Sequence, residues 1–120
     1  MFYMNAETLF CVGSKMIPEL EKYVNSKKEF LEQNGVKVIV INNSEIVPKC
    51  FKMNVLFETN KNLATFTVWE KGSELPVEAD IIVVNVPTRK TTISKTILPK
   101  QFQELVDAFE ELTDFLMVHS

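Results

Sequence analysis

The sequence has little of the chemistry that most enzyme sites need. Its 120 residues include one histidine, His119, two cysteines, Cys11 and Cys50, and three glycines. A Cys–His pair or a Ser–His–Asp triad needs a histidine held against its partner, and His119 is penultimate, where chains usually fray. Three separate glycines cannot cradle a phosphate, and no Cys/His cluster has metal-site spacing. We therefore expect no catalytic residue, no metal and no cofactor.

Long hydrophobic runs are also missing. No aliphatic run is longer than four residues, as at Ile81–Val84, far shorter than the about 20 residues that cross a bilayer. The N-terminus lacks the basic region of a signal peptide, and Glu7 interrupts its apolar stretch. We expect a cytoplasmic protein with no membrane partner, in which Cys11 and Cys50 stay reduced. A disulfide between them is the alternative, since two cysteines can pair.

Arginine is nearly absent, with Arg89 as the single example beside twelve lysines. The planar two-donor fork of arginine is what phosphate-binding surfaces favour. The formal net charge of −3 also opposes binding to a polyanion. We therefore expect no nucleic-acid partner.

Composition indicates one ordinary globular domain over residues 1–120. Hydrophobic residues make up 46% and charged residues 24%, and no Pro/Gly/Ser-rich stretch reads as a linker. At this length, folding buries roughly 65% of the surface of the unfolded chain, enough for an independent core.

Hydrophobic periodicity predicts six strands and two helices. The strands are expected over about 2–12, 36–41, 50–59, 63–70, 79–86 and 91–98, and the helices over about 15–34 and 99–118. The order is therefore β-α-β-β-β-β-β-α. Short connections join antiparallel neighbours, so the fold class is α+β, with a mostly antiparallel sheet of five or six strands and two helices packed on it.

The first helix has clear start and stop signals. Ser14 is a plausible N-cap, Pro18 is tolerated in the first turn, and Asn34-Gly35 supplies a left-handed exit. Its apolar residues recur at helical spacing and are expected in the core: Ile17, Leu20, Tyr23, Val24, Phe30 and Leu31.

The strand patterns predict which sides are covered. The 36–41 strand is almost continuously apolar, which suggests cover on both faces, and Asn42-Asn43-Ser44 reads as a loop after it. In the 50–59 and 63–70 hairpin, alternation places Phe66 and Val68 inward and Trp69 on the other side. Trp69 is then either a lid under a helix on that face or an interface anchor ringed by Glu70 and Glu74.

Charge is sorted by sign in the last forty residues. The only charged side chains between residues 81 and 103 are basic: Arg89, Lys90, Lys95 and Lys100. From residue 104 onward they are all acidic: Glu104, Asp107, Glu110, Glu111 and Asp114. The basic residues suit an edge strand that resists aggregation. The five acids share one arc of the final helix, with Phe115 beside them.

The acidic arc has two interpretations. A solvated helix face is the ordinary one. However, no lysine is interleaved to form i, i+4 pairs, and Asp114 lies near the helix C-terminus, where the dipole disfavours an anion. Because fields from like charges add, the second interpretation is a surface that docks a basic protein partner.

The region from Leu63 to Leu116 resembles a known family. A strand ending in an aromatic–acid pair and a Gly turn, "FTVWEKGSE", is followed by a strand pair and an acidic amphipathic helix. This layout is similar to small bacterial immunity proteins of contact-dependent growth inhibition and other polymorphic toxin systems. The resemblance implies a cytoplasmic, non-enzymatic protein that binds a cognate toxin, commonly a basic nuclease domain, and blocks its active site.

Two other functions fit the same sequence. A secretion chaperone for an effector protein is also small, acidic and α+β, and would be expected to dimerise. A small ligand-binding domain would need a pocket with convergent polar groups and a perturbed titratable residue. The sequence leaves the oligomeric state open.

Overall fold

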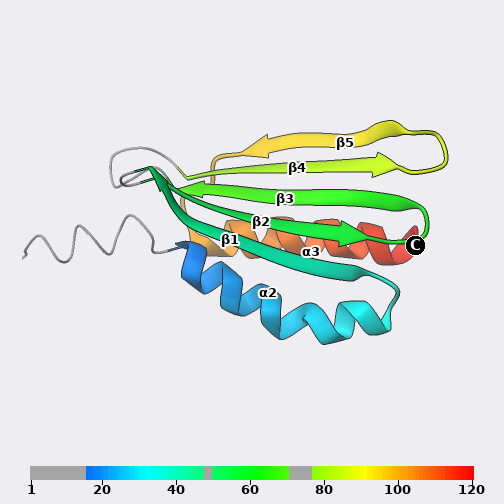
Figure 1. Cartoon of the computed structure of the whole chain (residues 1–120), viewed down its shortest axis with the longest axis horizontal. Helices are drawn as coiled ribbons and strands as arrows, with labels where there is room; N and C mark the ends of the chain where they lie inside the picture. The colour runs from blue at the N-terminus through cyan, green and yellow to red at the C-terminus, as the bar shows by residue number, and fades with distance from the viewer. Residues whose placement is uncertain (1–15, 48–49, 71–76) are drawn as a thin grey trace, which may run out of the picture.

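A computed structural model describes residues 16–47, 50–70 and 77–120, with only the backbone for residues 43–47. These residues form one five-stranded sheet and two helices (Figure 1). The elements are α2 (Met16–Gln33), β1 (Lys37–Val47), β2 (Cys50–Glu58), β3 (Asn62–Glu70), β4 (Glu78–Asn85), β5 (Lys90–Ile97) and α3 (Phe102–Val118). The predicted α+β class and antiparallel sheet are confirmed, while the expected 2–12 strand, Ser14 and Cys11 lie outside the described residues.

The sheet is a meander in which each strand pairs with its neighbour in the chain. Its order is β1-β2-β3-β4-β5, and all four pairings are antiparallel. In the β2–β3 hairpin, Val55 lies opposite Phe66 and Met53 opposite Val68. These inward side chains are buried, and the predicted alternation is confirmed.

Both helices pack on this inner face of the sheet (Figure 1). Phe109 of α3 is the centre of the packing, because its ring contacts Phe57 of β2, Phe66 of β3 and Tyr23 of α2, with centroids 5.5 to 6.0 Å apart. Tilted and edge-to-face rings at such distances add to the stabilisation from burial alone. The inner face, α2 and α3 therefore share one core.

The start of α2 is held by a buried carboxylate from the end of β3. Glu70 is only 3% exposed, and its two oxygens accept hydrogen bonds from the backbone N–H groups of Met16 (2.9 Å) and Ile17 (3.0 Å). N–H groups in the first helical turn have no partner inside the helix, so a strand residue acts as the cap. At the other end Gly35 has φ +85°, as the predicted left-handed exit requires.

Three local predictions were wrong. The Asn42–Ser44 segment is a bulge inside β1, not a loop, because β1 is an edge strand whose register shifts there without losing its pairing with β2. Ile39 and Ile41 are each 43% exposed, so β1 is covered on one face only. Phe30 is 54% exposed and lies outside the core stripe of α2.

Cys50 carries a free thiol.

Replacing Glu70 by alanine should destabilise the fold, because two N–H groups at the start of α2 lose their acceptors. We expect Glu70→Ala to lower the free energy of unfolding by about 2 kcal/mol, measured by urea denaturation. Glu58 is exposed at the opposite end of the same hairpin, so Glu58→Ala serves as the matched control and should change it by less than about 0.5 kcal/mol. Equal effects of the two substitutions would contradict the capping role.

The same carboxyl should also give the stability a pH dependence. Burial raises the pKa of Glu70 above its ordinary value, and the N–H groups of Met16 and Ile17 only partly oppose this. The folded protein therefore keeps the Glu70 proton to a higher pH than the unfolded chain, and stability falls as pH rises from about 4.5 through the folded pKa. Because Glu70→Gln cannot titrate, the stability of the wild type relative to this variant should decline over that range. A difference independent of pH would contradict the assignment.

Candidate functional site

The exposed side of α3 carries the five predicted carboxylates. All five acidic residues of the helix are exposed, whereas the residues between them are buried against the sheet: Leu105, Val106, Ala108, Phe109, Leu112, Thr113 and Leu116. The acidic surface, defined here as Glu104, Asp107, Glu110, Glu111 and Asp114, is therefore a real face of the fold. Its members differ in what else they contact.

Glu104 is occupied at the start of the helix. Its carboxylate accepts hydrogen bonds from the backbone N–H groups of Lys100 and Gln101, each at 2.9 Å, and with Gln101 it forms a capping box. Such reciprocal capping satisfies N–H groups that the helix cannot satisfy itself. Glu104 therefore has a structural role, although its side chain is exposed.

Glu111 and Asp107 are exposed and have polar neighbours. Lys95 of β5 forms an ion pair with Glu111 at 2.7 Å, and the amide of Gln103 donates to Asp107 at 2.8 Å. Exposed pairs of this kind contribute little to stability. The Lys95 contact brings the basic strand and the acidic helix together at one point.

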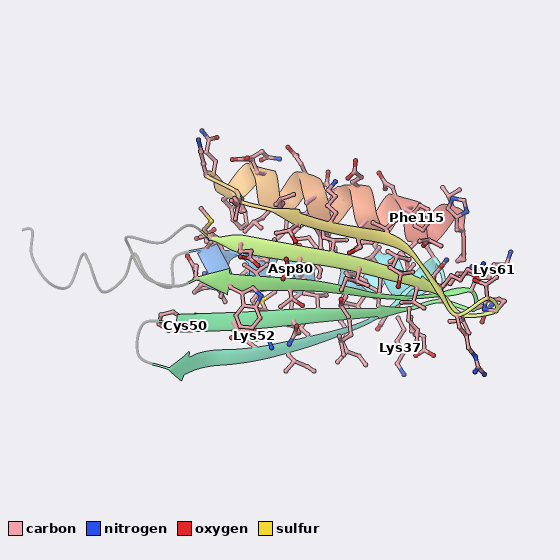
Figure 2. The ribbon with its side chains drawn as sticks, turned by 90° about the horizontal axis from the view of Figure 1, so that it is seen from above. Lys37, Cys50, Lys52, Lys61, Asp80 and Phe115 are labelled. Atoms are coloured by element: carbon pink, nitrogen blue, oxygen red, sulfur yellow. The ribbon has the colours of Figure 1, made fainter. Side chains whose placement is uncertain are left out.

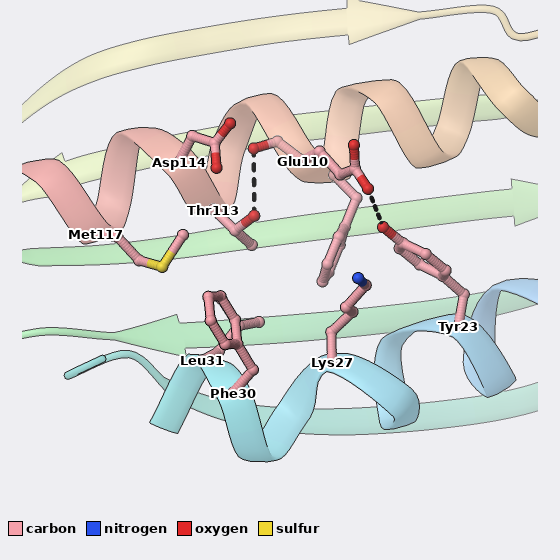
Figure 3. A pocket seen from close by; sticks show the side chains of 9 residues that line it. Tyr23, Lys27, Phe30, Leu31, Glu110, Thr113, Asp114 and Met117 are labelled. Atoms are coloured by element: carbon pink, nitrogen blue, oxygen red, sulfur yellow. Dashed lines mark hydrogen bonds between the residues drawn. The ribbon is translucent and has the colours of Figure 1, made fainter. Parts of the chain in front are cut away.

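Glu110 and Asp114 line a shallow cleft of about 120 Å³ between α2 and α3 (Figure 3). The Tyr23 hydroxyl donates a hydrogen bond to Glu110 across the cleft. Lys27 lies on the α2 side, with its Nζ 5.6 Å from the centre of the Tyr23 ring, and Phe30 adds an exposed aromatic wall. The cleft thus combines two carboxylates with aromatic surface, a combination that suits cationic side chains, and Lys27 supplies one such side chain on its α2 side.

The pKa of the Tyr23 hydroxyl reflects the negative charges around the cleft. Burial, the hydrogen bond to Glu110 and the negative charges of Glu110, Asp107 and Asp114 all raise the pKa of Tyr23 far above its ordinary value. Three of the five carboxylates therefore act on one point beside the cleft.

Sequence reasoning missed the α2 side of the cleft. The sequence pattern groups Tyr23 and Phe30 with the core stripe, but at 100° per residue they lie about 90° and 110° from the centre of the buried residues of α2, on the flank that faces α3. This angular offset from the core stripe is the feature of the sequence from which their place beside α3 could have been predicted.

Phe115 lies away from the cleft. It is half-buried and stacks on His119 with ring centroids 4.4 Å apart. Together with Lys61 and Asn85 these two rings line a hollow of about 290 Å³ beside the hairpin turns; Figure 2 shows Phe115 and Lys61 at the same end of the molecule. Both hollows are at or below the lower size limit of typical small-molecule pockets.

The structure separates the residues predicted around Trp69. Trp69 lies on the outer face of the sheet, half-buried, with Lys52 Nζ 4.5 Å from the centre of its ring. Both described helices pack on the opposite face, so the expected helix lid is wrong. Glu70 points inward to α2 and cannot ring Trp69 at the surface, and Glu74 lies outside the described residues.

The candidate catalytic groups do not come together in the described part of the chain. Cys50 begins β2, whereas the carbonyl of His119 accepts a hydrogen bond from Asn62 beyond the other end of that strand. A nine-residue strand puts about 27 Å between them. Glu58 and Glu70 are likewise at opposite ends of the hairpin. Residues 16–47, 50–70 and 77–120 contain no group of three or more potential metal ligands.

Comparison with protein families shows which family the chain belongs to. The model of the family described as Immunity protein TriTu matches residues 18–115, more than four fifths of the chain. The chain therefore belongs to this family of immunity proteins of polymorphic toxin systems, which confirms the resemblance seen in the sequence. Comparisons with curated proteins and with solved structures found no match. No helix within the described residues is long and apolar enough to span a membrane.

Removing two carboxylates should lower the pKa of Tyr23 measurably. The Tyr3→Phe variant leaves Tyr23 as the only tyrosine, so its ionisation can be followed by ultraviolet absorbance. We expect Tyr23 to ionise well above pH 10, and the added substitutions Asp107→Asn and Asp114→Asn to lower its pKa, because two negative charges near the phenolate disappear. An unchanged pKa would show that these side chains do not converge on Tyr23.

Proposed function

We propose that this protein neutralises a cognate toxin domain by binding it through the acidic surface of α3 and occluding it. The proposal rests on the immunity family and on one observation above all. Five carboxylates lie on the exposed side of α3, and within the described residues only Lys95 forms an ion pair with any of them. A surface of one sign attracts and orients a partner of the opposite sign.

The charge of this surface suggests the class of toxin. A nuclease that binds its substrate through phosphate contacts needs a cationic surface. An acidic inhibitor surface would be drawn to that surface and would cover it. We therefore propose a basic, nuclease-type toxin domain as the partner, blocked at its substrate-binding surface without any chemical step by the inhibitor.

The five carboxylates of the acidic surface are not proposed as equal contributors to toxin binding. Glu70 is buried as the cap of α2 and is not proposed as a direct contact. Glu104 caps α3 but keeps an exposed side chain, so it is proposed at the edge of the interface. Asp107, Glu110 and Asp114 converge beside Tyr23 and form the centre of the proposed interface. Glu111 lies at its edge with Lys95.

Aromatic side chains add contact area to the proposed interface. Phe30 lines the α2–α3 cleft and is 54% exposed, and buried aromatic anchors often carry much of the affinity of a protein interface. Phe115 remains a proposed contact at the periphery, whereas Trp69 lies on the opposite, outer face of the sheet and is left out of this interface. Glu74, also expected in the interface, lies outside the described residues. The site of action would be the cytoplasm, where a delivered nuclease meets its substrate.

Neutralising the centre of the surface should weaken toxin binding. We expect the double variant Asp107→Asn/Asp114→Asn to bind its cognate toxin domain about tenfold more weakly at low salt, measured by calorimetry. The difference should shrink as salt is added, because exposed charges are screened.

The matched control is Glu29→Gln/Glu32→Gln, which removes the same charge from exposed positions on α2 that do not line the cleft. It should bind like the wild type. Equal affinities of both double variants would exclude the α3 surface as the docking site. Failure of the wild-type chain to protect cells that express the toxin would reject the immunity function for that pair.

A further inference from the structure

The outer face of the sheet, opposite the helices, carries a row of mostly apolar side chains that crosses four strands. Ile39, Leu56, Thr65 and Ile82 are cross-strand neighbours on β1 to β4. Leu63 and Val84 form a second row beside them, and Ile41 extends the first along β1. No element within residues 16–47, 50–70 and 77–120 packs against these side chains.

This face holds a large share of the apolar surface that meets solvent. Eight large apolar side chains are exposed in the described part of the chain, and four of them, Ile39, Ile41, Leu63 and Ile82, lie here at 40 to 48% exposure. Clustered apolar exposure of this kind marks an interaction surface more often than scattered single residues do.

We propose that the outer face of the sheet binds a second copy of this chain, giving a dimer in which two sheets pack face to face. Sheets pack in this way about 10 Å apart with interdigitating side chains. The rows of Ile, Leu and Val on neighbouring strands supply such side chains. This inference is independent of the toxin and of the acidic surface.

The area of the face is sufficient for a stable dimer. Five strands of at least eight residues give a face of about 26 by 24 Å, or roughly 600 Å² per copy, from ordinary strand spacing and rise. Two copies would bury about 1,200 Å² in total, above the about 1,000 Å² expected of a specific interface.

The charges on the face also fit a second copy better than a strongly basic partner. One end carries Lys37 opposite Glu58, and the other carries Lys52 with Asp80 and Glu78 on nearby strands. Figure 2 labels Lys37, Lys52 and Asp80. Each end of the face therefore carries both positive and negative side chains. A two-fold dimer can bring together either the same ends or the opposite ends of the two sheets, and in both cases opposite charges come within reach. The single-sign surface of α3, by contrast, could not face its own copy without repulsion.

Such a dimer would leave both acidic surfaces free. Because α3 packs on the inner face of the sheet (Figure 1), joining two outer faces places the two α3 helices on opposite outsides of the dimer. Each copy could then hold its own toxin domain.

Sedimentation of the full chain, without toxin, tests the dimer. We expect the mass to rise from 13.8 kDa toward twice that value as the concentration increases through the micromolar range. Ile82→Lys should weaken the dimer by about 100-fold, because each interface would bury two such lysines. The matched control Val118→Lys adds the same charge at an α3 position that is 78% exposed, and should dimerise like the wild type.

Ile39→Thr and Leu63→Thr give a gentler pair of variants that keep strand-compatible side chains, in case Ile82→Lys prevents folding; each should weaken the dimer by about tenfold. A wild-type chain that stays monomeric at several hundred micromolar overturns the proposal. So does a dimer whose dissociation constant is the same in all outer-face variants, because its interface would then lie elsewhere.

Discussion

The packing of Phe109 between the sheet and α2 fixes the orientation of α3 and, with it, everything that the helix presents to solvent. Its ring meets Phe57, Phe66 and Tyr23, so rotation of α3 would pull an aromatic side chain out of a closely packed core. With the helix held this way, its carboxylates point outward along one side. The hydrogen bond from Tyr23 to Glu110 joins the two helices across the cleft beside them.

Much of this fold could be predicted because pattern and environment agree. The alternation in β2 and β3 has a single burial partner, the common core, so periodicity alone predicts which side chains point inward. The acidic surface was predictable for the same reason, since residues opposite a core stripe must face water. The prediction for Phe30 failed because α2 contacts both the sheet and α3. Its apolar residues therefore lie on two sides of the helix, and a single core-facing stripe does not describe them.

The remaining errors concern interactions between segments far apart in the sequence. In the sequence, Glu70 is only the last residue of a strand. Its carboxylate caps a helix more than fifty residues away, and this becomes visible only when α2 is placed against β3. The exposure of Ile39 has a similar origin: an apolar run on an edge strand looks like a fully covered strand until the number of layers is known. The pairing of Lys95 with Glu111 likewise depends on tertiary structure.

The order of the sheet has a consequence for how the chain assembles. Because every strand pairs with the strand before it, each pairing requires the closure of only a short loop, which costs little entropy. Topologies dominated by such local pairings fold quickly for β-rich proteins. We expect the strands of the meander to pair one hairpin after another. The last described element, α3, should dock late and complete the hydrophobic core.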